Sequence, residues 1–288
     1  MTDCKSTAGL RPHPRFATIC VLLLALGACS SNFVYNRLDT LAGWYIGSLV
    51  SLTDSQQSQL RQWLSQTLAW HRESELNRYS GFLRDLASQV MRPGTPEEYE
   101  QTEKRFEGFW KDLLQKATPD ATALLLSLSP QQVDELVQNM EEKSRERIEE
   151  DTDTKDWHRE QAKSLTRFVK RWMGSVTDEQ KSLIQSTART IEPTHDEWLA
   201  STQSWQHALR EALDLSDAER RSATVQGLLA KPDNEWTQEY VEKSQRNRQR
   251  YLGLIRSLDA TSAPRQREHL RSELLKIAGQ LDSIAAAK

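Results

Sequence analysis

Apolar residues recur every three or four positions along most of this 288-residue chain. A first stripe begins at Leu60 and continues to Val90, which is about eight turns at 3.6 residues per turn. A second stripe runs from Ile184 to Ala212 in alternating steps of four and three residues. Segments of alternating apolar and polar residues between hairpin turns, which would predict strands, are lacking. The pattern therefore predicts an all-α fold, an elongated bundle of long amphipathic helices.

Short polar motifs indicate where these helices begin. The strings LTDSQ, LSPQQ and VTDEQ each place a hydroxyl residue three positions before a Gln. The hydroxyl oxygen can accept a hydrogen bond from the N3 amide, and the Gln side chain can accept one from the N-cap amide, which together make a capping box. The pairs that fit this pattern are Thr53 with Gln56, Thr95 with Glu98, Ser129 with Gln132, Thr177 with Gln180, and Ser216 with Glu219.

These motifs divide the chain into nine predicted helices. Their approximate ranges are 34–50, 54–91, 96–117, 130–150, 153–174, 178–213, 217–229, 234–258 and 264–285. Pro193 falls inside the sixth and should kink or interrupt it. Before the last helix, SAPRQ has Ala263 where the capping hydroxyl would be, so a complete box is not expected there.

Two of the predicted long helices share an internal spacing. Gln56 is followed fifteen residues later by His71, and Gln180 is followed at the same distance by His195. A repeated spacing of this kind indicates duplication of a long-helix unit.

The first 28 residues have the pattern of a secretory signal. Lys5, Arg11 and Arg15 precede the apolar run FATICVLLLALGA at 16–28. That run is too short for a membrane-spanning helix and has the length of a signal-peptide core.

The run ends in Leu26-Gly27-Ala28-Cys29, which resembles a bacterial lipobox. The resemblance implies a diacylglyceryl group on the Cys29 thiol, cleavage before Cys29, and acylation of the new amine by a fatty acid such as palmitate. Three acyl chains would give permanent anchoring, because a single chain gives only marginal membrane binding. In lipoproteins of this type an Asp after the Cys favours inner-membrane retention, so Ser30 indicates the outer membrane.

Three parts of the chain follow from this interpretation. Residues 1–28 form a signal peptide, 29–33 a lipidated N-terminus with a short tether, and 34–288 an all-helical periplasmic domain. Cleavage removes three basic residues and one acidic residue, so the net charge changes from −3 to −5. A mildly acidic chain is a poor candidate for binding nucleic acid. Because Cys4 and Cys20 lie in the leader and Cys29 carries lipid, no thiol is left for a disulfide, a metal site or a nucleophile.

Two resemblances to known families extend this interpretation. The LTDSQ and VTDEQ strings resemble the LTxxQ motif of the Spy/CpxP type of helical periplasmic stress proteins. A fuller resemblance is to an uncharacterised family of proteobacterial lipoproteins that carry a domain of unknown function. The matching features are Cys29, Leu52–Gln56, Trp70–Arg72 with Tyr79, and Arg167-Phe168 with Trp172 and Thr177–Gln180. This resemblance implies no particular activity.

The string WHRE occurs at 70–73 and again at 157–160, which raises the possibility of duplicated chemistry. On a helix, a His and a Glu two residues apart point to nearly opposite sides, so they cannot bind one metal ion together. Metal-binding pairs on helices use a four-residue spacing. His71 has Glu75 at that spacing, but His158 has Ala162. We therefore expect helix packing, with no catalytic residues, no metal site and no cofactor beyond the lipid on Cys29.

All nine Trp residues lie after the predicted cleavage site. The pairs Trp63/Trp70 and Trp198/Trp205 are each seven residues apart, so each pair shares a helix face. Most Trp should be buried, and a minority exposed along a groove would make an adhesive surface. The candidate binding surface comprises Trp70, His71, Arg72, Trp157, His158, Arg159, His195, Trp198 and Trp205.

The leading hypothesis is a non-enzymatic outer-membrane lipoprotein that faces the periplasm and binds envelope proteins or unfolded clients. One alternative is an envelope hydrolase or lyase in which His195 or His71 acts with a carboxylate from another helix. A second alternative is a lipid or glycan carrier, which requires a deep apolar cavity. No Gly-rich phosphate loop, nucleophile elbow or HExxH motif is present in the sequence.

Overall fold

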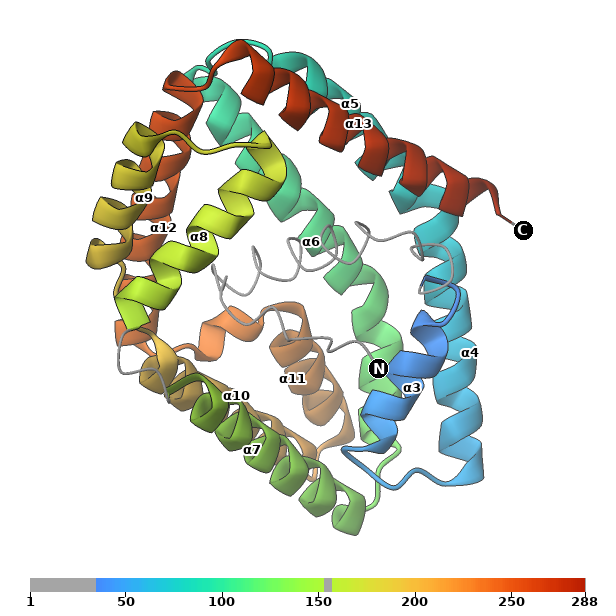
Figure 1. Cartoon of the computed structure of the whole chain (residues 1–288). Helices are drawn as coiled ribbons and strands as arrows, with labels where there is room; N and C mark the ends of the chain where they lie inside the picture. Colours follow the sequence, from blue (N-terminus) through green and yellow to red (C-terminus); the bar gives the residue numbers. More distant parts are fainter. Residues whose placement is uncertain (1–34, 153–156, 288) are drawn as a thin grey trace, which may run out of the picture.

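The computed structural model describes residues 35–152 and 157–287, and its described part is all-α, with no strand (Figure 1). The helices are α3 (Leu38–Gly47), α4 (Asp54–Trp70), α5 (Leu76–Gln89), α6 (Pro96–Leu126), α7 (Pro130–Thr152), α8 (Trp157–Met173), α9 (Asp178–Thr190), α10 (His195–Leu213), α11 (Ala218–Ala230), α12 (Gln238–Ala260) and α13 (Pro264–Ala286). A π-helical turn (His71–Glu75) joins α4 to α5, and a 3₁₀ turn (Pro232–Glu235) precedes α12. The predicted signal peptide, lipobox and tether lie outside the described residues, and so does residue 34, the first of the predicted helical domain.

The helices are arranged as a four-sided frame (Figure 1). α5 and α13 pack along one side, α8, α9 and α12 make a second side, and α7 packs on α10 along a third. α3 and α4 make the fourth side, while α6 crosses the frame and packs against both α4 and α11.

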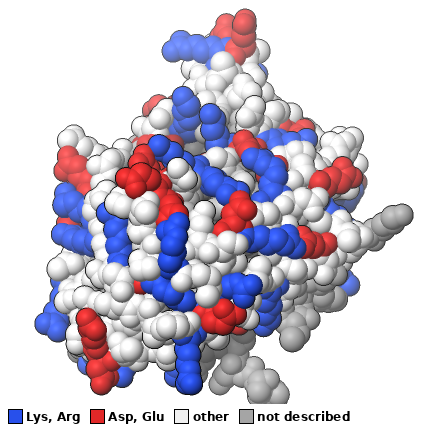
Figure 2. Space-filling model, turned by 90° about the horizontal axis from the view of Figure 1, so that it is seen from above, with Lys and Arg blue, Asp and Glu red and all other residues white. Residues whose placement is uncertain are grey.

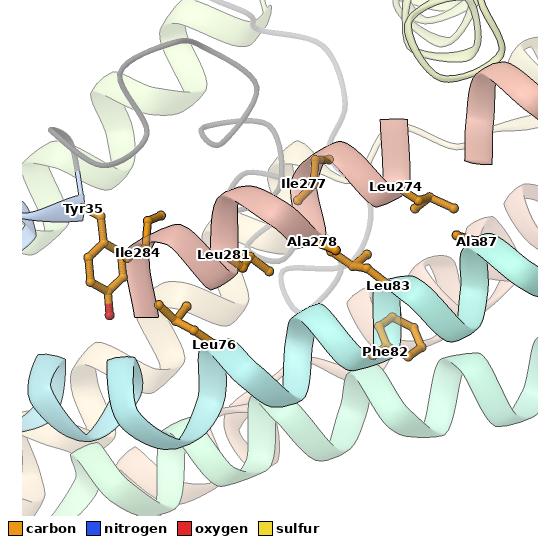
Figure 3. Close-up of a cluster of buried hydrophobic side chains, with 10 residues drawn as sticks. All are labelled: Tyr35, Leu76, Phe82, Leu83, Ala87, Leu274, Ile277, Ala278, Leu281 and Ile284. Carbon is orange, nitrogen blue, oxygen red and sulfur yellow. The ribbon is translucent and has the colours of Figure 1, made fainter. Parts of the chain in front are cut away.

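The apolar core is divided among the sides of this frame. The largest cluster, with ten buried residues, lies between α5 and α13 and includes Leu76, Leu83, Ile277 and Tyr35 (Figure 3). A second cluster of seven joins α8, α9 and α12, and a third of six joins α7, α10 and α11. Burying each large aliphatic side chain contributes about 1.5–3 kcal/mol. Packing therefore stabilises the frame along its sides.

Four of the five predicted capping boxes are confirmed. In each one the hydroxyl oxygen accepts a hydrogen bond from the N3 amide at 3.2–3.3 Å, and the side chain of the N3 residue accepts one from the N-cap amide at 2.8–3.0 Å. These boxes start α4, α6, α7 and α9, and their N-caps are Thr53, Thr95, Ser129 and Thr177.

The fifth predicted box, Ser216 with Glu219, is wrong. Asp217 is the N-cap of α11, and its carboxylate accepts from the Arg220 amide at 2.7 Å. A carboxylate makes a charge-assisted bond to the helix N-terminus, which a hydroxyl cannot match. At α13, Gln266 Oε1 still accepts from the Ala263 amide at 2.9 Å, so half of the box is retained without the hydroxyl.

Two predicted helix ranges need correction. The helix predicted at 96–117 continues through Pro119 to Leu126, where its last turns pack against α11. That packing offsets the hydrogen bond that an interior Pro removes. The last-but-one helix begins at Gln238 rather than near 234, because Thr237 caps it by accepting from the Tyr240 amide at 3.3 Å.

The duplicated spacing extends over two whole helix pairs. α4 and α9 begin at Asp54 and Asp178, and α5 and α10 end at Gln89 and Leu213, so both ends are offset by 124 residues. Each unit is interrupted at the same place, at His71 in the first and immediately before His195 in the second. The first unit continues through its π turn, whereas the second breaks at 191–194, as Pro193 predicts.

Two reciprocal glutamine pairs, which we call the glutamine clasps, fasten the frame. Gln56 Nε2 donates to Gln132 Oε1 at 3.1 Å, and Gln132 Nε2 donates back to Gln56 Oε1 at 2.7 Å. Gln180 and Gln266 make the same pair of bonds at 3.1 and 2.8 Å. The first clasp joins the start of α4 to the start of α7, and the second joins α9 to α13.

Each clasp amide also bonds a carbonyl of the loop before the partner helix. Gln132 Nε2 donates to Ser51 O at 2.7 Å, and Gln266 Nε2 donates to Ser175 O at 2.9 Å. Together with the capping bonds, these contacts use both hydrogens and both lone-pair positions of the side-chain amide. The clasp Gln residues therefore cap their own helices and join the start of each duplicated unit to the start of a helix outside it.

Candidate functional site

The first WHRE segment lies at the π turn, where the imidazole of His71 is half-buried. Tyr35 Oη and His71 Nδ1 are hydrogen-bonded at 2.9 Å, and the two rings stack at a centroid distance of 5.9 Å. The Tyr79 ring meets His71 edge-on at 5.5 Å. Burial lowers the pKa of His71 to about 4, so the imidazole is neutral at neutral pH. Short π turns within α-helices are rare and are frequent at functional sites.

Arg72 ties both ends of the described chain to this turn. Its guanidinium donates to Ala287 O at 2.9 Å and to Asn36 Oδ1 at 2.6 Å, and it lies over the Tyr35 ring at 5.3 Å. The neighbouring Trp70 is half-buried, with its ring 6.3 Å from that of His71. This segment therefore holds the N-terminal and C-terminal ends together.

The spacing that could pair His71 with Glu75 does not bring them into a hydrogen bond. Glu75 is buried, and its carboxylate accepts two hydrogen bonds from Arg78 at 2.8 and 2.9 Å. Arg78 also bridges to Asp112 on α6 at 2.8 Å. The acidic group is thus used in an ion-pair network between helices, while His71 bonds a phenol.

The second WHRE segment has a different environment at the start of α8. His158 is exposed, and its Nδ1 lies 2.9 Å from Ala188 O of α9. Trp157 is half-buried, with its ring edge-on to His158 at 5.0 Å and to His195 at 6.2 Å. Arg159 is exposed and lies 3.6 Å from Glu160. We call Trp157, His158, Arg159, His195 and Trp198 the aromatic corner.

Trp198 and Trp205 lie two turns apart on α10. The guanidinium of Arg147 on α7 lies 5.4 Å from the centre of the Trp198 ring. Trp205 Nε1 donates to Leu228 O of α11 at 3.1 Å, and its ring packs against the cluster between α7, α10 and α11. Trp205 therefore serves in packing, while Trp198 lies beside the aromatic corner.

The residues of the predicted binding surface form two separate groups. The group around His71 lies at the α4–α5 junction on one side of the frame, and the aromatic corner lies where α8 and α10 begin, on the opposite side (Figure 1). The repeated WHRE letters do not correspond to the structural repeat, which pairs His71 with His195. Eight of the nine Trp are half-buried, and Trp44 is the exposed one.

Several contacts of these two groups were not predicted from the sequence. Tyr35 and Ala287 reach the π turn from 36 and 215 residues away, and nothing in the local sequence indicates either contact. Glu197, two residues after His195, forms an ion pair with Lys243 of α12. Within the described ranges, no group of three or more His, Cys, Asp or Glu side chains could hold a metal ion. A search of the same residues finds no helix both long and apolar enough for a membrane span.

Comparison with known proteins identifies a family and no characterised relative. The family model of DUF6279, a family of unknown function, matches residues 48–241. No curated protein and no solved structure matches the chain. The matched segment runs from the end of α3 to the start of α12, so it contains the whole duplicated unit and the aromatic corner. The chain therefore belongs to the DUF6279 family.

Proposed function

We propose that this protein is an outer-membrane lipoprotein, anchored through Cys29 and facing the periplasm, whose helical frame is a scaffold that binds envelope proteins or unfolded clients. The lipobox and the preceding signal pattern support the anchor. Tyr35 supports a short tether, since it lies six residues after Cys29 and is already buried in the largest apolar cluster. Six residues reach at most about 20 Å, so the frame would stay close to the lipid.

The aromatic corner is the observation that carries the binding role. It combines half-buried rings of Trp157, His195 and Trp198 with the exposed side chains of His158 and Arg159. Large amphipathic rings beside Arg are typical of the residues that dominate binding energy at protein interfaces. The LTxxQ likeness to the Spy/CpxP proteins points to the same kind of role.

The charge distribution supports a protein partner over nucleic acid. Figure 2 shows Lys and Arg interspersed with Asp and Glu across the face that it views, without a continuous basic patch on that face. Nucleic-acid binding relies on a basic patch or stripe that neutralises phosphates.

A hydrolase or lyase is the second candidate, and the π turn is the feature that favours it. Such an activity needs a His and a carboxylate from different helices to act on one substrate. The lowered pKa of His71 makes it a weak base at neutral pH, and Glu75 is paired with Arg78. These two facts weigh against catalysis at the π turn and favour a structural role for it, so the enzyme ranks below the binding role.

Site-specific photo-crosslinking in cells tests the proposed binding role. A crosslinking amino acid would replace His158 or Arg159 in the full-length lipidated chain, with Lys170, exposed further along α8, as the matched control. We expect crosslinks from 158 and 159 that are stronger than those from 170. A single partner would indicate a scaffold, and many partners a holder of unfolded clients. Equal or absent crosslinking at all three positions would contradict a binding role for this corner.

A further inference from the structure

α3 exposes large apolar side chains along one face. Trp44 is 74% exposed, Tyr45 54% and Leu41 50%. These residues are spaced at i, i+3 and i+4, so they form one continuous patch, which we call the α3 face. The other side of the helix packs against α4, where Gly43 lies close to Leu64.

The equivalent face of the second duplicated unit is covered by protein. α3 precedes the capping box of α4 as α8 precedes that of α9, so the two helices occupy equivalent places in the duplicated units. At the 124-residue offset, the residues of the α3 face correspond to Leu165, Phe168 and Val169 of α8, which lie in or against the cluster between α8, α9 and α12. The same face is exposed on α3, so its exposed rings need another explanation.

The position of α3 in the chain identifies what covers this face. α3 begins at Leu38, nine residues after Cys29. Nine extended residues reach at most about 30 Å, so an anchor at Cys29 keeps the start of α3 within about 30 Å of the lipid and lets the helix reach the bilayer surface. This step rests on the proposed function. The ten residues of α3 span about 15 Å, half the thickness of the hydrocarbon core, so the helix cannot cross it, and its contact with the bilayer would be along the surface.

The chemistry of the α3 face suits the interface of a phospholipid bilayer. Trp and Tyr combine an apolar ring with one polar group and concentrate at the headgroup level of membranes. The ammonium of Lys143 lies 6.0 Å from the centre of the Tyr45 ring, which places a cation at the edge of the patch for anionic headgroups.

We infer that the α3 face inserts into the interface of the bilayer that holds the acyl chains of Cys29. The helix lies in the membrane plane with Leu41, Trp44 and Tyr45 among the lipid headgroups and upper acyl chains. A lipid chain alone lets a domain rotate freely on its tether, whereas this second contact fixes its orientation. The rest of the frame, including the aromatic corner, is then held at a defined height above the membrane.

Spin labels on single cysteines test this inference in the lipidated full-length protein. Leu41→Cys places a label on the α3 face, and Lys170→Cys places one at an exposed position of α8. Cys4 and Cys20 are replaced by Ser in both chains. The proteins are reconstituted into vesicles of phosphatidylethanolamine and phosphatidylglycerol at 3:1. Accessibility is measured by power saturation with oxygen, which partitions into lipid, and with a water-soluble nickel chelate.

We expect the label at 41 to be more accessible to oxygen and several-fold less accessible to the nickel chelate than the label at 170. Adding Trp44→Lys and Tyr45→Lys should return position 41 to the accessibility of position 170, with an unchanged circular dichroism spectrum. Vesicle flotation separates the two proposals. Protein that floats but has equal nickel accessibility at both positions would overturn the α3 contact and leave the anchor standing.

Two other outcomes also overturn the inference. Protein that fails to float with the vesicles refutes the anchor, and with it the location of α3. A label at 41 that is shielded from both reagents, with or without vesicles, would show that protein covers the α3 face, either a partner or a second copy of the chain.

Discussion

At the scale of single residues, the burial of His71 links the stability of the fold to pH. Its neighbours are Tyr35, Tyr79 and Arg72, and burial lowers its pKa from 6.5 in an unfolded chain to about 4. Between these values the unfolded chain binds a proton that the folded chain does not. Lowering the pH from 6.5 to about 4 therefore destabilises the fold, and the stability is fully present above pH 6.5.

Replacement of His71 by Asn should flatten this pH dependence. The Asn Oδ1 can accept from Tyr35 in place of Nδ1, but the side chain does not titrate. The wild type should lose up to about 3 kcal/mol more than the variant between pH 7 and pH 4. Urea unfolding at several pH values measures the difference. The exposed His207→Asn is the control and should keep the wild-type slope; a parallel slope for His71→Asn would refute the assignment.

The phenol of Tyr35 should contribute to stability through the same contact. Tyr35→Phe removes its hydrogen bond to Nδ1 and leaves a half-buried polar nitrogen without that partner. We expect a loss of about 1–2 kcal/mol. Tyr45→Phe, which changes an exposed ring, should alter the free energy of unfolding by less than about 0.5 kcal/mol. Equal effects in thermal or urea unfolding would argue against a structural role for the Tyr35–His71 bond.

At the scale of helices, the glutamine clasps are the most informative elements. Gln180 is completely buried and Gln266 nearly so, so the removal of either side chain leaves amide groups of the other unsatisfied. Gln266→Ala should cost about 2–4 kcal/mol, since each orphaned polar group costs about 1–3 kcal/mol. Gln131→Ala, at an exposed position, is the control.

A double-mutant cycle of Gln180→Met and Gln266→Met should show strong coupling between these two residues. The second replacement removes the groups that the first left unpaired. The free energy of unfolding of the double variant should therefore exceed the additive value by about 1 kcal/mol or more. Chemical denaturation of the four proteins measures this coupling. Additive effects would mean that the two amides act only as separate caps.

The correction at α11 gives a second test at this scale. Asp217→Ala removes the observed cap and should cost about 1 kcal/mol, whereas Ser216→Ala should cost less than about 0.5 kcal/mol. The reverse order in thermal unfolding would restore Ser216 as the N-cap.

Most helix ranges and capping boxes were predictable because the residues that start a helix lie next to it in the sequence. Periodicity and capping residues lie within a few positions of each other, so most helix ranges and four boxes agree with the structure. The partner of each clasp was not predictable, since Gln56 and Gln132 are 76 residues apart and each is already explained by its own cap. The contacts of Tyr35 and Ala287 with the π turn, and the exposure of α3, likewise depend on tertiary packing.

At the scale of the whole molecule, the proposed lipid anchor would determine where the frame can act. Cys29→Ser should abolish incorporation of an alkyne-labelled fatty acid and move the protein from the membrane fraction to the soluble fraction. The folded domain should be unaffected, because Cys29 precedes all described residues. Labelling followed by fractionation measures both effects. Ser31→Ala, which keeps Cys29, is the control and should remain in the membrane fraction. Fatty-acid incorporation that persists in Cys29→Ser would refute this site.

Each duplicated unit packs one of its helices against a helix from the other half of the chain. The long helix of the first unit, α5, packs against α13, and the long helix of the second unit, α10, packs against α7 of the first half. α5 and α13 are separated by about 190 residues, a separation that slows folding because a large loop must close before the contact forms.

This exchange sets an order in which the newly made chain can fold. α13 begins more than 170 residues after α5 ends, so the part of the apolar face of α5 that packs on it, with Leu76 and Leu83, lacks this partner until α13 has been made. An uncovered helix face of this kind is where a nascent chain aggregates or needs a chaperone. Loss of α13 would therefore harm the first half of the described chain as much as the last, and a truncation before α13 would act as a null allele.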